Sequence, residues 1–191
     1  VMRWNVGTKI GAGFGLALII VTALGVVSFR GTAQLIAAAE SRRHTYDVLT
    51  QHDQVLLAFQ ELEISQRNYL MTGSAPYLAA FEAALPLLDT HVARLRSLLA
   101  GDPEMQSRLG AVEALARQRI AAARDTIDLY RSDGQAAAIA RVREGLGQRL
   151  REQTLAVLKG MHDDEQRRLA ERIAATARQA QLSQRTILVG T

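Results

Sequence analysis

An uncharged apolar segment is the feature that most constrains this chain of 191 residues. Residues 10–29 contain no charged side chain and lie between Lys9 and Arg30. A helix of about 20 residues spans roughly 30 Å, the thickness of the hydrocarbon core of a bilayer. We therefore expect a transmembrane helix at 10–29 that follows a cytoplasmic segment at 1–9. A cleaved signal peptide is the alternative, but its apolar core would be only about 7 to 15 residues long.

A second apolar segment begins near the other end of the chain. Residues 186–191 turn apolar directly after a polar run that ends at Arg185. We expect them to start a second transmembrane helix that continues beyond the sequence given, so that the chain is a fragment. A short apolar tail is the alternative. Two such helices would leave residues 30–185 as a domain with both ends at the same face of the bilayer.

Three glycines at the membrane entry are spaced by four residues. Gly7, Gly11 and Gly15 form two overlapping GxxxG patterns, and this spacing lets two membrane helices approach closely. We expect a possible membrane-helix contact there. A phosphate-binding loop is excluded for the same segment, because neither a preceding strand nor a following Lys-Ser/Thr pair is present.

The segment between the two apolar ends has the composition of a helical protein. Hydrophobic residues make up 48% of the chain, prolines number three, and cysteines are absent. This mixture favours helix over strand, and it excludes disulfides and thiolate metal sites. The net charge of +4 comes from charges that alternate in sign, as on solvated helix faces. No basic run is interleaved with aromatic residues, so we expect no nucleic-acid partner.

Apolar residues at spacings of three and four mark the successive helices. The patterns end at glycines and at an Asp-Pro pair, which are typical helix boundaries. They predict an all-α, antiparallel four-helix bundle of long helices that continue into the flanking transmembrane helices. The predicted helices run to about residue 71, over 75–99, from 103 to the Ser-Asp-Gly stop at 132–134, over a short segment at 135–143, and from about 148 onward.

Polar residues interrupt the apolar row of the first helix. Within ELEISQRNYLMTG, residues 61–73, Glu63 and Gln66 share the row of Leu62 and Tyr69. Glu63 and Arg67 are four residues apart and can form an ion pair that sets the register of the bundle. Alternatively, Glu63, Gln66 and Arg67 line a small polar pocket that binds a signal molecule. A solvated face is the third interpretation.

The same stretch ends in a predicted turn. Thr72 offers a hydroxyl to the turn, and Gly73 supplies a positive φ. Ser74 is expected to cap the next helix, with Pro76 near its start.

This stretch also resembles a known family. The pattern ExxQRxYLxTG from Glu63 to Gly73, preceded by HTYDVL at 44–49, resembles the third type of CHASE extracellular sensor domains. That resemblance covers roughly residues 35–180. It implies a periplasmic four-helix bundle in bacterial membrane receptors, most often sensor histidine kinases. Homodimerisation, an unknown periplasmic ligand or partner protein, and signalling by helix displacement are further expectations from it.

The chain itself carries no recognisable catalytic motif. We therefore expect no enzyme activity and no cofactor in this segment; any histidine kinase or cyclase domain would lie beyond residue 191. No metal site is expected, because His162 and Glu165 alone share a helix face and two ligands seldom suffice. The alternative function is a membrane-tethered bundle that docks a partner without any signalling output.

Overall fold

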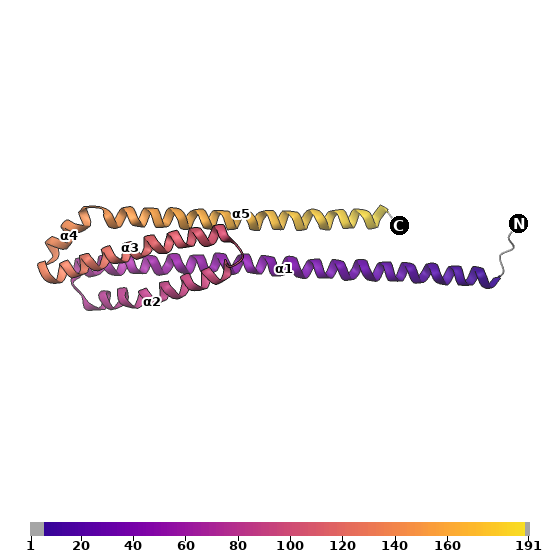
Figure 1. The fold of residues 1–191 in the computed structure, drawn as a ribbon, viewed down its shortest axis with the longest axis horizontal. Coiled ribbons are helices and arrows are strands. Elements are labelled where there is room, and N and C mark those ends of the chain that lie inside the picture. Colours follow the sequence, from indigo (N-terminus) through magenta and orange to yellow (C-terminus); the bar gives the residue numbers. More distant parts are fainter. Residues whose placement is uncertain (1–5, 190–191) are drawn as a thin grey trace. The chain divides into compact units, whose positions relative to one another are not determined.

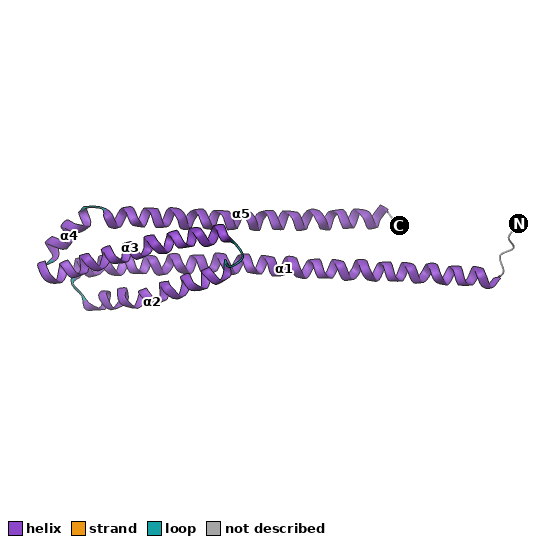
Figure 2. Ribbon diagram, in the orientation of Figure 1, coloured by secondary structure: helices purple, strands orange, loops and turns teal. Residues whose placement is uncertain are grey.

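The computed structural model describes residues 6–189, with side chains described for residue 11, residues 13–175 and residues 177–178. The predictions made for residues 1–5 and 190–191 lie outside this range. Helices account for all regular secondary structure in the described residues, where no strand occurs (Figure 2). The predicted all-α fold is therefore confirmed.

Five helices follow one another along the chain (Figure 1). The chain divides into two compact units, and α1 contributes to both because the division falls between Arg43 and His44. The helices are α1 (Val6–Thr72), α2 (Ala75–Leu98), α3 (Pro103–Asp133), α4 (Gln135–Arg143) and α5 (Leu146–Val189).

The first unit contains the apolar segment of α1. Among the described residues, only α1 has a stretch long and apolar enough to cross a membrane by length and composition, with a mean hydropathy of 1.9 and no buried residue. An added Cβ at Gly11 or Gly15 would meet nothing within 4 Å. Gly7 belongs to the same helix, but its surroundings are not among those described. The membrane contact of these glycines stays a prediction, and so does the start of a second span at 186–191.

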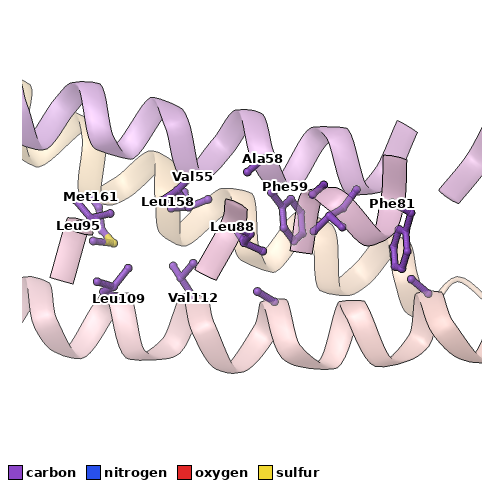
Figure 3. Close-up of a cluster of buried hydrophobic side chains, with 14 of the residues drawn as sticks. Val55, Ala58, Phe59, Phe81, Leu88, Leu95, Leu109, Val112, Leu158 and Met161 are labelled. Atoms are coloured by element: carbon purple, nitrogen blue, oxygen red, sulfur yellow. The ribbon is translucent and has the colours of Figure 1, made fainter. Parts of the chain in front are cut away.

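In the second unit, the later part of α1 forms an antiparallel bundle with α2, α3 and α5. Side chains from all four helices meet in one apolar core (Figure 3). The residues that helical spacing places on one row of α1 are all buried, including two polar ones: Val48, His52, Val55, Phe59, Leu62, Gln66 and Tyr69. The largest fully buried apolar side chains are Phe59, Phe81, Leu95, Leu109 and Leu158.

Glycine and aspartate residues fix the ends of the helices as predicted. Gly134 and Gly145 bound α4 and have φ values of 87° and 77°, a conformation that costs glycine little. Asp102 caps α3, where its carboxylate accepts a hydrogen bond of 3.0 Å from the Met105 amide. Ser74 occupies the N-cap of α2, but its hydroxyl makes no capping bond.

The buried face of α5 differs from the one that helical spacing predicts, which contains Leu155, Leu158, His162, Glu165, Leu169 and Ile173. The helix begins at Leu146, so Gly147 lies in its first turn and does not interrupt it. Its buried row runs through Leu150, Thr154, Leu158, Met161 and Glu165, whereas Ile173 is 45% exposed. Arg168 of α5 contacts Asp102 in the α2–α3 turn, so this level of α5 is where α2 and α3 end. Ile173 follows more than one helical turn later and therefore lies beyond both helices.

Candidate functional site

Glu63 connects three helices of the bundle. This α1 residue is only 8% exposed. Its Oε2 accepts a hydrogen bond of 2.8 Å from Nε of Arg151 on α5, and its Oε1 lies 3.6 Å from Nε of Arg119 on α3. Both Glu63 Oε1 and Arg119 Nε are buried without a hydrogen-bond partner among the described groups. The carboxylate is therefore only partly satisfied by the two guanidinium groups that face it.

The predicted ion pair between Glu63 and Arg67 does not form. Glu63 points toward α3 and α5, where its two guanidinium partners lie. Arg67 is exposed and has no ion pair or hydrogen bond among the described residues. Two guanidinium groups from other helices already contact the Glu63 carboxylate, so Arg67 on the same helix forms no ion pair with it.

Gln66 extends the polar cluster that Glu63, Arg119 and Arg151 form. Its Oε1 accepts a hydrogen bond of 2.7 Å from Nη2 of Arg119, and its Nε2 donates one of 2.6 Å to the Thr126 hydroxyl. That hydroxyl donates in turn to the Ala123 carbonyl at 2.8 Å. This chain of hydrogen bonds fixes α1 against α3 and holds the Arg119 side chain in place, because the side chains of Gln66 and Thr126 both find partners in it.

The turn after α1 is built by Thr72 and Gly73. The Thr72 hydroxyl donates to the Asn68 carbonyl at 2.7 Å and accepts from the Ser74 amide at 3.2 Å. Gly73 has a φ of 69°. A Cβ at this glycine would stand 2.6 Å from the hydroxyl of Tyr130. Both the backbone conformation and the close approach of α3 therefore require glycine here.

A cavity of 570 Å³ opens beside this cluster. Its size is within the range of small-molecule sites. All three residues proposed from the sequence for a pocket, Glu63, Gln66 and Arg67, lie on its wall. The remaining lining residues come from α1, α3, α4 and α5: Leu70, Met71, Arg119, Ala122, Asp125, Thr126, Ile139, Arg141, Val142, Arg143, Leu146, Gly147, Gln148 and Arg151.

Positive charge dominates the cavity wall. Five arginines and two carboxylates line it. Asp125 pairs with Arg141 at 2.9 Å, and Glu63 is shared by two more arginines, whereas Arg67 and Arg143 have no ion pair among the described residues. Burial lowers the pKa of the Arg119 guanidinium; Glu63 opposes this effect, and the neighbouring Arg151 and Arg67 add to it. A negative charge placed in the cavity would therefore be stabilised by cations that are under-compensated.

An apolar rim completes the cavity. Met71, Ile139, Val142 and Leu146 all line it, and all are among the exposed large hydrophobic side chains, at 38% to 67%. Exposed apolar side chains gathered around a polar site are typical of ligand pockets. The combination of an apolar rim with free guanidinium groups suits an organic anion with an apolar body.

Helix α4 forms one side of the cavity and is held at both ends. Gln135 donates hydrogen bonds to the Leu70 and Met71 carbonyls of α1 at 2.9 and 3.1 Å. Arg141 attaches the other end to Asp125 of α3. These polar contacts, with a glycine of positive φ at each end, make α4 a short wall of the site that is attached to both α1 and α3.

Arg119 and Arg151, the central cations of the site, were not predicted. Arg119 lies three residues after Ala116 and four before Ala123, on the apolar row of α3. Arg151 stands in the corresponding place on α5, three residues before the buried Thr154. A charged residue at a position where helical spacing places apolar residues was the signal that could have identified Arg119 and Arg151, as it identified Glu63.

His162 and Glu165, which share a face of α5, contact different partners. Glu165 lies 3.7 Å from Arg168 and 4.0 Å from Arg172. His162 instead faces His52 of α1, with the two ring centroids 5.1 Å apart.

Comparison with known proteins identifies relatives of this bundle. The family model of the CHASE3 domain matches residues 38–175. The crystal structure of the sensor domain of histidine kinase HK9 from Rhodopseudomonas palustris is similar in fold, with a TM-score of 0.60 and 24% sequence identity. That similarity covers 65% of this chain and 97% of the other. No curated protein sequence matches the chain.

Proposed function

This chain belongs to the CHASE3 domain family, and we propose that its bundle senses an organic anion bound in the arginine-lined cavity. The observation that carries the proposal is the joint position of Arg67 and Arg143 on the wall of one cavity. Neither guanidinium group has an ion pair with any residue that the structure describes. Guanidinium groups bind carboxylates with paired, charge-assisted hydrogen bonds. The apolar rim would bury the body of the ligand.

Binding would change the relation between α1 and α5. Arg67 belongs to α1, Arg151 to α5, and Glu63 of α1 now holds Arg151. An anion that engages Arg151 competes with Glu63 for the same guanidinium group, and it therefore weakens a contact that ties the two helices together. A ligand shifts a two-state equilibrium by its difference in affinity for the two states. A small displacement of α5 along α1 is the expected consequence.

We further propose that α1 and α5 carry this displacement across the inner membrane of a bacterial cell. The apolar segment of α1 supports a membrane span at 10–29, and residues 186–191 would begin the second one. The output domain would then follow residue 191. A histidine kinase is the favoured output, because the bundle shares its fold with the sensor domain of such a kinase; receptors of this kind are expected to act as homodimers.

The proposal is tested by ligand-induced stabilisation of the full chain in detergent. The probes are hexanoate, benzoate, phenylacetate and adipate, each compared with its neutral amide. A ligand at about 100 times its Kd adds about 2.7 kcal/mol of stability, which raises Tm by roughly 5 °C or more for a domain of this size. We expect at least one carboxylate to raise Tm while its amide does not. Equal effects of acids and amides, or no effect of any acid, would overturn the proposal.

A further inference from the structure

His52 of α1 has a defined tautomer. The side chain is 5% exposed, and its Nε2 lies 2.8 Å from the carbonyl oxygen of Leu158 on α5. A carbonyl oxygen can only accept, so Nε2 carries the proton and donates the hydrogen bond. The lone pair of the neutral imidazole is therefore on Nδ1. Burial lowers the pKa of the His52 imidazole, which favours this neutral form.

Two lone-pair nitrogens and one carboxylate converge near this residue. Nδ1 of His52 and Nδ1 of His162 are both buried without a hydrogen-bond partner among the described groups. Oδ1 of Asp53 lies 3.7 Å from the first nitrogen and 3.8 Å from the second, beyond hydrogen-bond length. These three atoms lie within 4.8 Å of one another. Buried polar atoms without partners are uncommon, because each has lost its hydrogen bonds to water without replacing them.

The distances from Oδ1 of Asp53 to the two Nδ1 atoms fit ligands of one shared cation better than direct hydrogen bonds. Ligand atoms about 2.1 Å from a tetrahedral ion are about 3.4 Å apart, close to the two distances measured to Asp53. Asp53 is 58% exposed, so its carboxylate can move the small distance that brings Oδ1 to this separation from the two nitrogens. Imidazole and carboxylate donors together are typical of zinc and its neighbours in the first transition series.

The outer nitrogen of each imidazole is also held. His52 donates to the Leu158 carbonyl, and Nε2 of His162 lies 2.8 Å from Nε2 of the Gln166 side-chain amide. A half-turn of this amide exchanges its nitrogen and oxygen. With Oε1 in this place, Gln166 accepts the Nε2 proton of His162, and Nδ1 of His162 then has the lone pair that a metal requires. Histidines that ligate metals normally donate from their other nitrogen in this way, which fixes the tautomer and the ring orientation.

We propose that His52, Asp53 and His162 form a binding site for a divalent transition metal such as Zn²⁺, with Nδ1 of each imidazole and Oδ1 of Asp53 as the protein ligands and water in the remaining position. The site joins α1 to α5, because its ligands come from both helices. A bound metal therefore fixes the register of these two helices. The metal site is separate from the arginine-lined cavity, and it does not depend on the identity of the anion.

Zn²⁺ and Co²⁺ binding to the untagged full chain in detergent, after removal of metals with a chelator, tests this site. Calorimetry should show one Zn²⁺ per chain, and Co²⁺ should give the visible absorption of a four-coordinate ion. The variants Asp53→Ala and His162→Ala remove partly exposed ligands, so they preserve the core. Each should weaken Zn²⁺ binding at least about 10-fold and should abolish the rise in Tm that Zn²⁺ causes in the unaltered chain.

Two further variants complete the experiment. His44→Ala is the matched control, because His44 is exposed on α1 outside the cluster; its Zn²⁺ affinity should equal that of the unaltered chain. His52→Gln removes the third ligand but keeps an amide donor for the Leu158 carbonyl. The proposal is overturned if the unaltered chain binds no Zn²⁺, or if Asp53→Ala and His162→Ala bind it as tightly as His44→Ala does.

Discussion

Nε of Arg151 lies 2.8 Å from Oε2 of Glu63, and this hydrogen bond joins two residues that are 88 positions apart in the sequence. The same carboxylate faces Arg119 on α3. One buried acid is thus shared by two guanidinium groups, while Arg67 beside it has no ion pair among the described residues. This unequal distribution of charge explains how the helices are held, and it is the basis on which we propose an anion as the ligand of the cavity.

Glu63→Gln should destabilise the bundle. The substitution keeps the shape of the side chain but removes the charge that compensates Arg119, whose side chain is only 14% exposed. Breaking a buried pair by removing one partner costs about 3–5 kcal/mol; the exposure of Arg151 places this case near 3 kcal/mol. Urea unfolding measures the loss, and Glu82→Gln, at an exposed position of α2, is the control. If both variants unfold at the same urea concentration, the carboxylate has no structural role.

Arg67→Ala should weaken anion binding and leave stability nearly unchanged. Arg67 is exposed and unpaired, so its removal disrupts no described contact, whereas a charge-assisted bond to a ligand contributes about 1.5–3 kcal/mol. The Kd of the best carboxylate should therefore rise about 10-fold or more by calorimetry. Arg94→Ala, which removes an exposed arginine of α2 outside the cavity, should bind like the unaltered chain. Equal affinities for the two variants would remove Arg67 from the site.

Gly73→Ala should destabilise the turn between α1 and α2. A φ of 69° costs a residue with a Cβ about 1–2 kcal/mol, and the clash with the Tyr130 hydroxyl adds to this cost. Gly110→Ala is a control of opposite sign, because this glycine lies inside α3 with nothing within 4 Å of an added Cβ; it should stabilise the bundle by up to about 1 kcal/mol. Adding Tyr130→Phe to Gly73→Ala should recover only the part due to the clash.

Stability should fall with acid through Asp102. The Arg168 guanidinium, and then the Met105 amide, lower the pKa of the Asp102 carboxyl below 3.8. A carboxyl with a lower pKa in the folded state stabilises the fold above the unfolded pKa, and it loses this contribution as the pH falls from about 5 through the folded value. Asp102→Asn keeps a capping side chain but loses the charge.

This variant should therefore be less stable at pH 7, by about 1 kcal/mol, as expected for a partly exposed pair. Its stability should also fall less steeply between pH 5 and pH 3, as measured by thermal unfolding. Arg168→Gln should flatten the profile in the same way, whereas Asp89→Asn, at an exposed position of α2, should not. Parallel profiles for the unaltered chain and Asp102→Asn would contradict the assignment.

The fold could be predicted from the sequence because each of its signals is local. The glycines that end helices, the Asp-Pro start of α3 and the apolar row of α1 act within a few residues, and the structure has all of them. The face of α5 was less predictable, because Ile173 matches the pattern but lies beyond the ends of α2 and α3. Whether an apolar residue is buried depends on where the neighbouring helices stop.

The site could be predicted only on one helix. Glu63 and Gln66 stood out because they interrupt an apolar row, but their partners Arg119 and Arg151 depend on the register between helices. The spacing of Glu63 and Arg67 favoured a contact within α1, and two cations from other helices displaced it. His52 and His162 are separated by more than 100 residues, so their encounter could not be predicted from spacing.

The proposed displacement of α5 relative to α1 is the central claim. Double electron–electron resonance measures the distance between a spin label on each helix and therefore tests this claim directly. The chain has no cysteine, so Thr50→Cys on α1 and Gln153→Cys on α5, both at exposed positions, place two unique labels. We predict that the carboxylate that raises Tm most will shift the distance distribution, and that Arg67→Ala will abolish the shift. An unchanged distribution at a carboxylate concentration that saturates the stabilisation would contradict the account.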